Sequence, residues 1–258
     1  MKNILFFTLL LSCSLPPRSG AADSPKKPRE ADDFLMGSVV KSDKWKMDRT
    51  NDREIFEGNV SFRNPRYMLK ADYALYTRPA QTWNMKGSIY LLRRFDDKSH
   101  VEMNCDKAVY FETLEEAILE RGALPVRIKY SGPDGRILRG RADKTFAENK
   151  KGLMTFDGSF SLSTENLDMY SQKALYNNAE GTFLMHDSTP MAVGNRQDYD
   201  FAIRSEKIKF FKDSRDIKFY NRVTGWVKDV EVSSASVSAA NKGYPRQTDR
   251  PAAAKAKP

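Results

Sequence analysis

Apolar and polar residues alternate along short stretches of the chain, which is the pattern of a β-strand with one buried face. In the clearest stretch Trp83, Met85, Ile89 and Leu91 fall on one face. A similar strand, residues 69–76, precedes it, and a segment rich in turn-forming residues separates the two. The pattern predicts a strand, a turn and a returning strand.

This unit recurs six times. In each unit a small residue is followed by an acid or its amide, and Gly, Asn or Asp comes 16 or 17 residues later. The small residues are Ser42, Ala71, Cys105, Ala142, Ser171 and Ser205, and the later positions are Gly58, Gly87, Gly122, Gly158, Asp187 and Asn221. A period of about 33 residues is typical of stacked repeats in which each unit covers its neighbour's apolar face. We therefore predict roughly twelve strands, two per unit, between residues 40 and 228.

The two recurring positions predict bends in the strands. Residues that tolerate a positive φ at the later position indicate a bulge or bend in every returning strand. Three and five residues after the small position the chain is mostly apolar, as at Ala74 and Tyr76. A second bulge after the small residue would let these positions face inward together. The expected fold class is all-β, with an antiparallel sheet that curls at these positions.

Composition argues against an enzyme. The chain has 258 residues, 40% of them hydrophobic and 30% charged, which suits a soluble globular protein. It contains only two histidines and two cysteines, and His100 and His186 lie in different units without a catalytic motif around them. No Gly-rich phosphate loop or paired metal-ligand motif is present. We expect no enzymatic activity, no cofactor and no metal site, and Cys105 is expected to be a small packing residue.

The two ends of the chain differ from the repeats. Residues 1–22 have the pattern of a signal peptide, because their apolar stretch is too short to span a bilayer. Alternatively, Leu10 to Cys13 resembles a lipoprotein signal, in which Cys13 would carry a lipid. Either signal directs the chain out of the cytoplasm. Residues 23–39 read as a flexible linker, and residues 229–258, rich in Ser, Ala, Pro and Lys, as a disordered tail.

A family resemblance covers nearly all of residues 40–228. It is carried by Phe56-Glu57-Gly58-Asn59-Val60 and by Leu69-Lys70-Ala71-Asp72 with Ala74 and Tyr76, preceded by Ser42-Asp43 and Trp45. The sequence resembles the OstA-like proteins of lipopolysaccharide transport, the periplasmic components LptA and LptC. The resemblance implies a curled antiparallel β-jellyroll whose hydrophobic trough carries the acyl chains of lipopolysaccharide across the periplasm.

The resemblance and the apolar positions of the repeats together give the expected lipid-binding residues. They are Trp45, Met47, Phe56, Val60, Leu69, Ala71, Ala74, Tyr76, Met85, Ile89, Ala108, Tyr110, Phe156, Phe160, Ala174, Tyr176, Ile208 and Phe210. The alternative is that these side chains form a closed, dry core. The formal net charge of +9 suits an anionic glycolipid, and the candidate headgroup-binding residues near strand ends are Arg63, Arg66, Lys70, Arg93, Arg94 and Arg139. A solvated basic face is the alternative for each of them.

Three functions remain in competition at this level. The first is an LptA-like carrier that binds lipopolysaccharide and joins other Lpt components, or copies of itself, through edge strands near residues 40–47 and 218–228. The second is an LptC-like component of the same pathway, anchored by a lipid on Cys13. The third is a structural envelope protein that binds proteins by its edges and binds no lipid. Nucleic acid is not an expected partner, since basic and acidic residues are interspersed.

Overall fold

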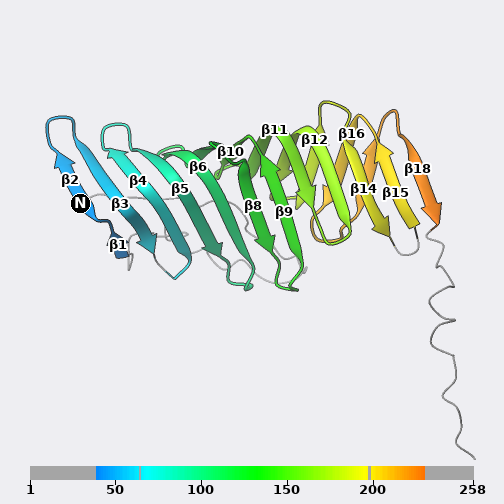
Figure 1. The fold of residues 1–258 in the computed structure, drawn as a ribbon, viewed down its shortest axis with the longest axis horizontal. Helices are drawn as coiled ribbons and strands as arrows, with labels where there is room; N and C mark the ends of the chain where they lie inside the picture. The colour runs from blue at the N-terminus through cyan, green and yellow to red at the C-terminus, as the bar shows by residue number, and fades with distance from the viewer. Residues whose placement is uncertain (1–38, 64, 197–198, 230–258) are drawn as a thin grey trace, which may run out of the picture.

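The computed structural model of the protein describes residues 39–229, except residues 64 and 197–198. These residues form eighteen antiparallel strands in one elongated sheet, with no helix among them (Figure 1). The predicted signal sequence with Cys13, and nearly all of the predicted linker and tail, lie outside the described residues. The all-β fold class predicted from the repeats is confirmed.

Twelve legs of chain account for the eighteen strands. Six legs are single long strands, namely β3 (Arg53–Arg63), β4 (Tyr67–Thr77), β5 (Thr82–Arg94), β6 (His100–Phe111), β11 (Leu153–Ser163) and β12 (Leu167–Asn177). The other six are each divided in two, namely β1 (Val39–Lys41) with β2 (Lys44–Asp48), β7 (Glu116–Glu120) with β8 (Val126–Ser131), β9 (Ile137–Ala142) with β10 (Lys144–Glu148), β13 (Thr182–His186) with β14 (Met191–Arg196), β15 (Tyr199–Arg204) with β16 (Lys207–Phe211), and β17 (Ile217–Tyr220) with β18 (Thr224–Asp229). The predicted twelve strands are therefore these twelve legs, and division at the corner raises the count.

The two recurring sequence positions form the corner of each leg. The long strands change register there, between Glu57 and Val60 in β3 and between Lys86 and Ile89 in β5. Gly87 has a φ of +74°, and the carboxylate of Asp72 occupies the space that a Cβ would need. Later units keep the positive φ without glycine, at Asp187 (64°) and Asn221 (58°). The predicted bends and their positions are confirmed.

Because every leg bends at the corner, the sheet folds onto itself in two layers. Layer A consists of β1, β8, β9, β14, β15 and β18 with the adjoining halves of the long strands, and layer B consists of β2, β7, β10, β13, β16 and β17 with the other halves. The inner faces of the layers meet, as where the ring centroids of Phe62 and Trp83 lie 5.3 Å apart. This is a curled antiparallel β-jellyroll. Opposite the corners, the hairpin turns of the two layers face each other along a seam.

The register follows the alternation of the sequence. Ala71, Ala74 and Tyr76, at offsets zero, three and five from the small position, are all buried. The shift in register between Lys70 and Tyr73 provides the bulge that this spacing requires. One apolar core therefore runs the length of the described chain, between the inner faces of the layers.

Candidate functional site

The predicted lipid-binding residues face the interior between the layers. All of them are buried except Trp45 and Met47, which are 59% and 39% exposed. Trp45 pairs with Phe56 across β2 and β3 and so shares its inward face. It is exposed because no strand of the described chain lies beyond β2, which pairs only with β3. The inward register predicted for these residues is confirmed, whereas lipid binding by them remains a prediction.

Side chains fill the middle of this interior. Trp83, Tyr110, Met85 and Ala174 are 0 to 1% exposed. The cavity found there holds about 50 Å³ and is lined by apolar residues such as Phe156 and Phe160. Over this length the interior matches the closed-core alternative. An acyl chain could not enter it without separation of the layers.

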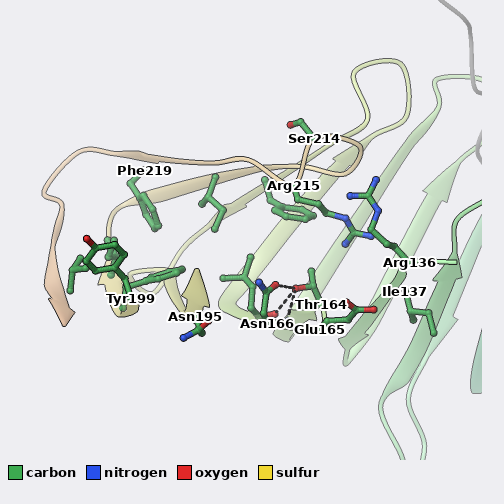
Figure 2. Close-up of a pocket in the computed structure, with 16 residues that line it drawn as sticks. Arg136, Ile137, Thr164, Glu165, Asn166, Asn195, Tyr199, Ser214, Arg215 and Phe219 are labelled. Carbon is green, nitrogen blue, oxygen red and sulfur yellow. Dashed lines mark hydrogen bonds between the residues drawn. The ribbon is translucent and has the colours of Figure 1, made fainter. Parts of the chain in front are cut away.

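The interior opens at its C-terminal end. A cavity of about 450 Å³ lies between β12, β14, β15 and β18 of layer A and β16 and β17 of layer B (Figure 2). We call it the end pocket. Its apolar lining comprises Ile137, Leu167, Phe201, Ile203, Phe210, Ile217, Phe219 and Val227. Such a cavity has the size and lining of sites that bind small apolar ligands.

The sequence analysis identified only Phe210 among the lining residues of the end pocket. A usable signal was present, because Ile217 and Phe219 alternate with Lys218, and Phe201 alternates with Asp200. Strand β15 pairs with β18 in layer A, and β16 pairs with β17 in layer B. The sequence did not indicate that these two pairs would lie apart and leave the space between them unfilled.

Polar groups surround the mouth of the end pocket. The β11–β12 turn contributes Thr164 and Asn166, whose side chains lie 3.3 Å apart at Thr164 Oγ1 and Asn166 Oδ1. The β8–β9 turn contributes Arg136 and the β16–β17 turn contributes Arg215, and the two guanidinium groups lie side by side in Figure 2. The site therefore joins an apolar interior to a charged rim.

The predicted headgroup residues are divided between two faces. Arg63, Lys70 and Arg94, together with Lys41, line an open hollow of about 760 Å³. Lys41 pairs with Ser61 and Ser61 with Lys70, in a row that alternates with buried residues, so the hollow lies on the outer face of layer A. The structure thus gathers these cations, but on the side opposite the interior.

The remaining predicted headgroup residues lie apart from this hollow. Arg139 lies on the same outer face further along, next to the buried Leu138. Arg66, in the β3–β4 turn, is 3.6 Å from the Asp96 carboxylate. Arg93 has the opposite orientation, with its guanidinium 5.4 Å from the ring centroid of Tyr67 and 4.8 Å from that of Phe95.

One carboxyl group is buried beside the packed interior. Glu112 accepts hydrogen bonds from Trp83 Nε1 at 2.9 Å and from the Tyr76 hydroxyl at 3.0 Å. Burial raises the pKa of Glu112 above its usual value, and the two hydrogen bonds oppose that rise. Burial also raises the pKa of the Cys105 thiol to about 12, which makes it inert and agrees with its predicted packing role.

No group of three or more His, Cys, Asp or Glu residues that could hold a metal ion occurs between residues 39 and 229, leaving aside 64 and 197–198. In the same part of the chain, no helix has the length and apolarity to cross a membrane.

The family model described as "LptA/(LptD N-terminal domain) LPS transport protein" matches residues 39–216. The chain belongs to this family. The resemblance to LptA-type proteins predicted from the sequence is thereby confirmed, and it covers the curled sheet almost completely. The family is one of lipopolysaccharide transport proteins and not of enzymes.

Among solved structures, this LptA-type chain is similar to LptH from Pseudomonas aeruginosa, described as the LptA-homologous periplasmic component of the lipopolysaccharide transport device. The two are 9% identical, and the match covers 74% of this chain and 94% of that chain with a TM-score of 0.21. No curated protein matches the sequence.

Proposed function

We propose that this protein is a periplasmic carrier of lipopolysaccharide that shields acyl chains between its two layers. The observation that carries the proposal is the continuous apolar interior that opens at one end into a cavity of about 450 Å³. Membership of a lipopolysaccharide transport family supports the same conclusion. The proposed entry point is the end pocket, because it is open without any movement of the layers.

The energetics favour apolar contacts as the source of affinity. Burying one methylene stabilises by about 0.8 kcal/mol, so a chain of a dozen carbons contributes on the order of 10 kcal/mol before entropic costs. One hydrogen bond contributes only about 1 kcal/mol net. Passage beyond the end pocket requires the layers to separate at the seam, where turns of the two layers meet, as Arg136 meets the carbonyl oxygen of Asp213.

A photo-crosslinking residue at Phe219 tests the proposal. Phe219 points into the end pocket, whereas Lys218, its neighbour on β17, is exposed on the other face and serves as the matched control. We expect glycolipid to be captured at position 219 and not at 218 in the native envelope. Mass spectrometry of protein purified gently from that envelope should identify the same lipid. Absence of lipid in both experiments would refute the carrier function.

The proposed partners bind at the two edges of the sheet. In the described chain, β1 and β2 pair only with β3, β18 pairs only with β15, and β17 pairs only with β16. Val40 and Trp45 at one edge, and Trp226 and Val227 at the other, are exposed. Such edges suit strand addition by other Lpt components or by copies of the protein. A strict monomer in concentration-dependent sedimentation, with no Lpt protein in pull-downs, would contradict this.

Two other functions have specific tests. An anchored, LptC-like role requires a lipid on Cys13, which mass spectrometry of the N-terminal peptide would detect. A structural envelope protein is favoured by the packed middle of the interior, where Tyr110 and Ala174 are 0% exposed. That function predicts no crosslinked lipid at Phe219, while the edges still bind proteins.

A further inference from the structure

The mouth of the end pocket brings together two arginine residues that are far apart in the sequence. Arg136 follows the tip of the β8–β9 hairpin in layer A, and Arg215 lies in the β16–β17 turn of layer B. The two turns are in contact, because Arg136 Nη2 donates a hydrogen bond to the Asp213 carbonyl oxygen at 3.5 Å. The two guanidinium groups therefore lie across the seam from one another, at the point where the apolar interior opens (Figure 2).

Among the described residues, Arg136 has an acidic partner and Arg215 has none. The Asp134 carboxylate accepts a hydrogen bond from Arg136 Nε. Arg215 Nε is buried and has no hydrogen-bond partner among the described residues. A buried donor without a partner is unfavourable, and it is more so for a charged group. The site is therefore electrostatically incomplete on the side of Arg215.

The surrounding charges indicate what would complete it. Burial lowers the pKa of Arg215 from its usual value, and the nearby charge of Arg136 lowers it further. Asp134 and Glu165 oppose this effect, yet neither forms an ion pair with Arg215 in the described structure. Two adjacent guanidinium groups, of which only that of Arg136 is paired with a carboxylate, attract an anion. A phosphate suits them well, since guanidinium donors match its oxygens in pairs.

The backbone holds Arg215 in this position at a cost. Its φ is 61°, in the left-handed region that non-glycine residues rarely adopt. The β16–β17 turn is also fixed by Lys212, which is 5% exposed and whose Nζ lies 4.8 Å from the ring centroid of Tyr130 in layer A. Arg215 is thus placed over the mouth by a turn that is attached to the opposite layer, and its side chain is not a freely solvated surface arginine.

We propose that the end pocket binds an acyl chain of a phosphorylated lipid and that Arg136 and Arg215 together bind the phosphate of that lipid. Leu167, Phe201, Ile203, Phe210, Ile217 and Phe219 contact the chain below the phosphate. The inference rests on the proposed carrier function and adds to it the residues that recognise the headgroup. It also transfers this role from Arg63, Lys70 and Arg94, which lie on the outer face, to a pair that the sequence analysis did not identify.

Binding of two matched lipids to the full chain tests the proposal. One is the acylated, phosphorylated glucosamine disaccharide of lipopolysaccharide, and the other is the same molecule without its phosphates. We expect Arg136→Gln and Arg215→Gln each to weaken binding of the phosphorylated lipid about tenfold or more. Binding of the dephosphorylated lipid should remain that of the unmodified protein.

Two further variants separate recognition from folding. Arg222→Gln removes the same charge at a residue whose side chain is 87% exposed at the corner between β17 and β18, and it should leave both affinities unchanged. Arg215→Lys keeps the charge but loses the paired donors, so its affinity for the phosphorylated lipid should be intermediate. Thermal unfolding of each variant verifies that it is folded.

The outcomes distinguish this inference from the carrier function. If the unmodified protein binds neither lipid, the carrier function fails. If it binds both, and Arg136→Gln and Arg215→Gln bind the phosphorylated lipid as tightly as it does, the inference is wrong while the carrier function stands. An equal loss of affinity for both lipids in these variants would also overturn the inference, because the arginines would then only hold the turns in place.

Discussion

In the first four units an acid and a glycine are in close contact at the corner, and Gly87→Ala tests this contact. A Cβ added at Gly87 would lie 2.3 Å from Asp72 Oδ2 and 2.9 Å from Asp72 Cβ. Rotation of the carboxylate would not relieve the second clash, so the backbone of β4 or β5 must shift. The variant would therefore combine two costs, the strained φ and the overpacking.

The chain contains a matched control for the first cost. Gly135 has a φ of +79°, similar to the +74° of Gly87, but nothing lies within 4 Å of its added Cβ. A left-handed alanine costs about 1–2 kcal/mol. Alanine also restricts the conformations of the unfolded chain, which offsets about 0.4–1 kcal/mol of this cost. Gly135→Ala should thus destabilise by about 1 kcal/mol.

Overpacking adds about 1–3 kcal/mol at Gly87, so Gly87→Ala should destabilise by about 2–4 kcal/mol. Urea unfolding of both variants with an unchanged m-value gives the two free energies of unfolding. Asp72→Ala should cost less in the Gly87→Ala background than in the unmodified protein, because it removes one of the clashing groups. A loss at Gly87 no greater than that at Gly135, or simple additivity with Asp72→Ala, would refute the reasoning.

Three further predictions concern the core, the buried carboxyl group and the sheet edge. Ala74→Asp places a charge at a position with 0% exposure and should reduce the free energy of unfolding by more than about 3 kcal/mol. Leu75→Asp, on the outer face, should reduce it much less. Similar urea midpoints for the two variants would show that the register is wrong. Because the pKa of Glu112 is raised in the folded state, its contribution to stability is full below the usual glutamate pKa and is lost as pH rises through the raised value. The stability difference between the unmodified protein and Glu112→Gln should therefore fall across that window, and a pH-independent difference would contradict the prediction. Trp226→Pro, at an exposed edge residue of β18 that does not line the end pocket, should reduce self-association in sedimentation by about tenfold or more without loss of lipid binding. Unchanged self-association would rule out strand addition at this edge.

The inward-facing residues of the packed interior could be predicted from alternation and repeat spacing, whereas only Phe210 of the end pocket was predicted. The inward register of residues such as Leu69 and Met85 follows from period two and a bulge at a known position. Whether the space between the layers is filled could not be predicted in this way. That depends on how side chains from different units interdigitate, as where Phe62 of layer A packs against Trp83 of layer B.

The sequence by itself determined the repeating unit, the corner in each leg and the face that each apolar residue presents. These are local properties, because chain stiffness, φ tolerance and alternation act within about twenty residues. Only the tertiary structure decided where the interior stays open and which cations lie at its mouth. Arg136 and Arg215 belong to different repeats, and they meet only because the folded sheet brings the turns of its two layers together at the seam.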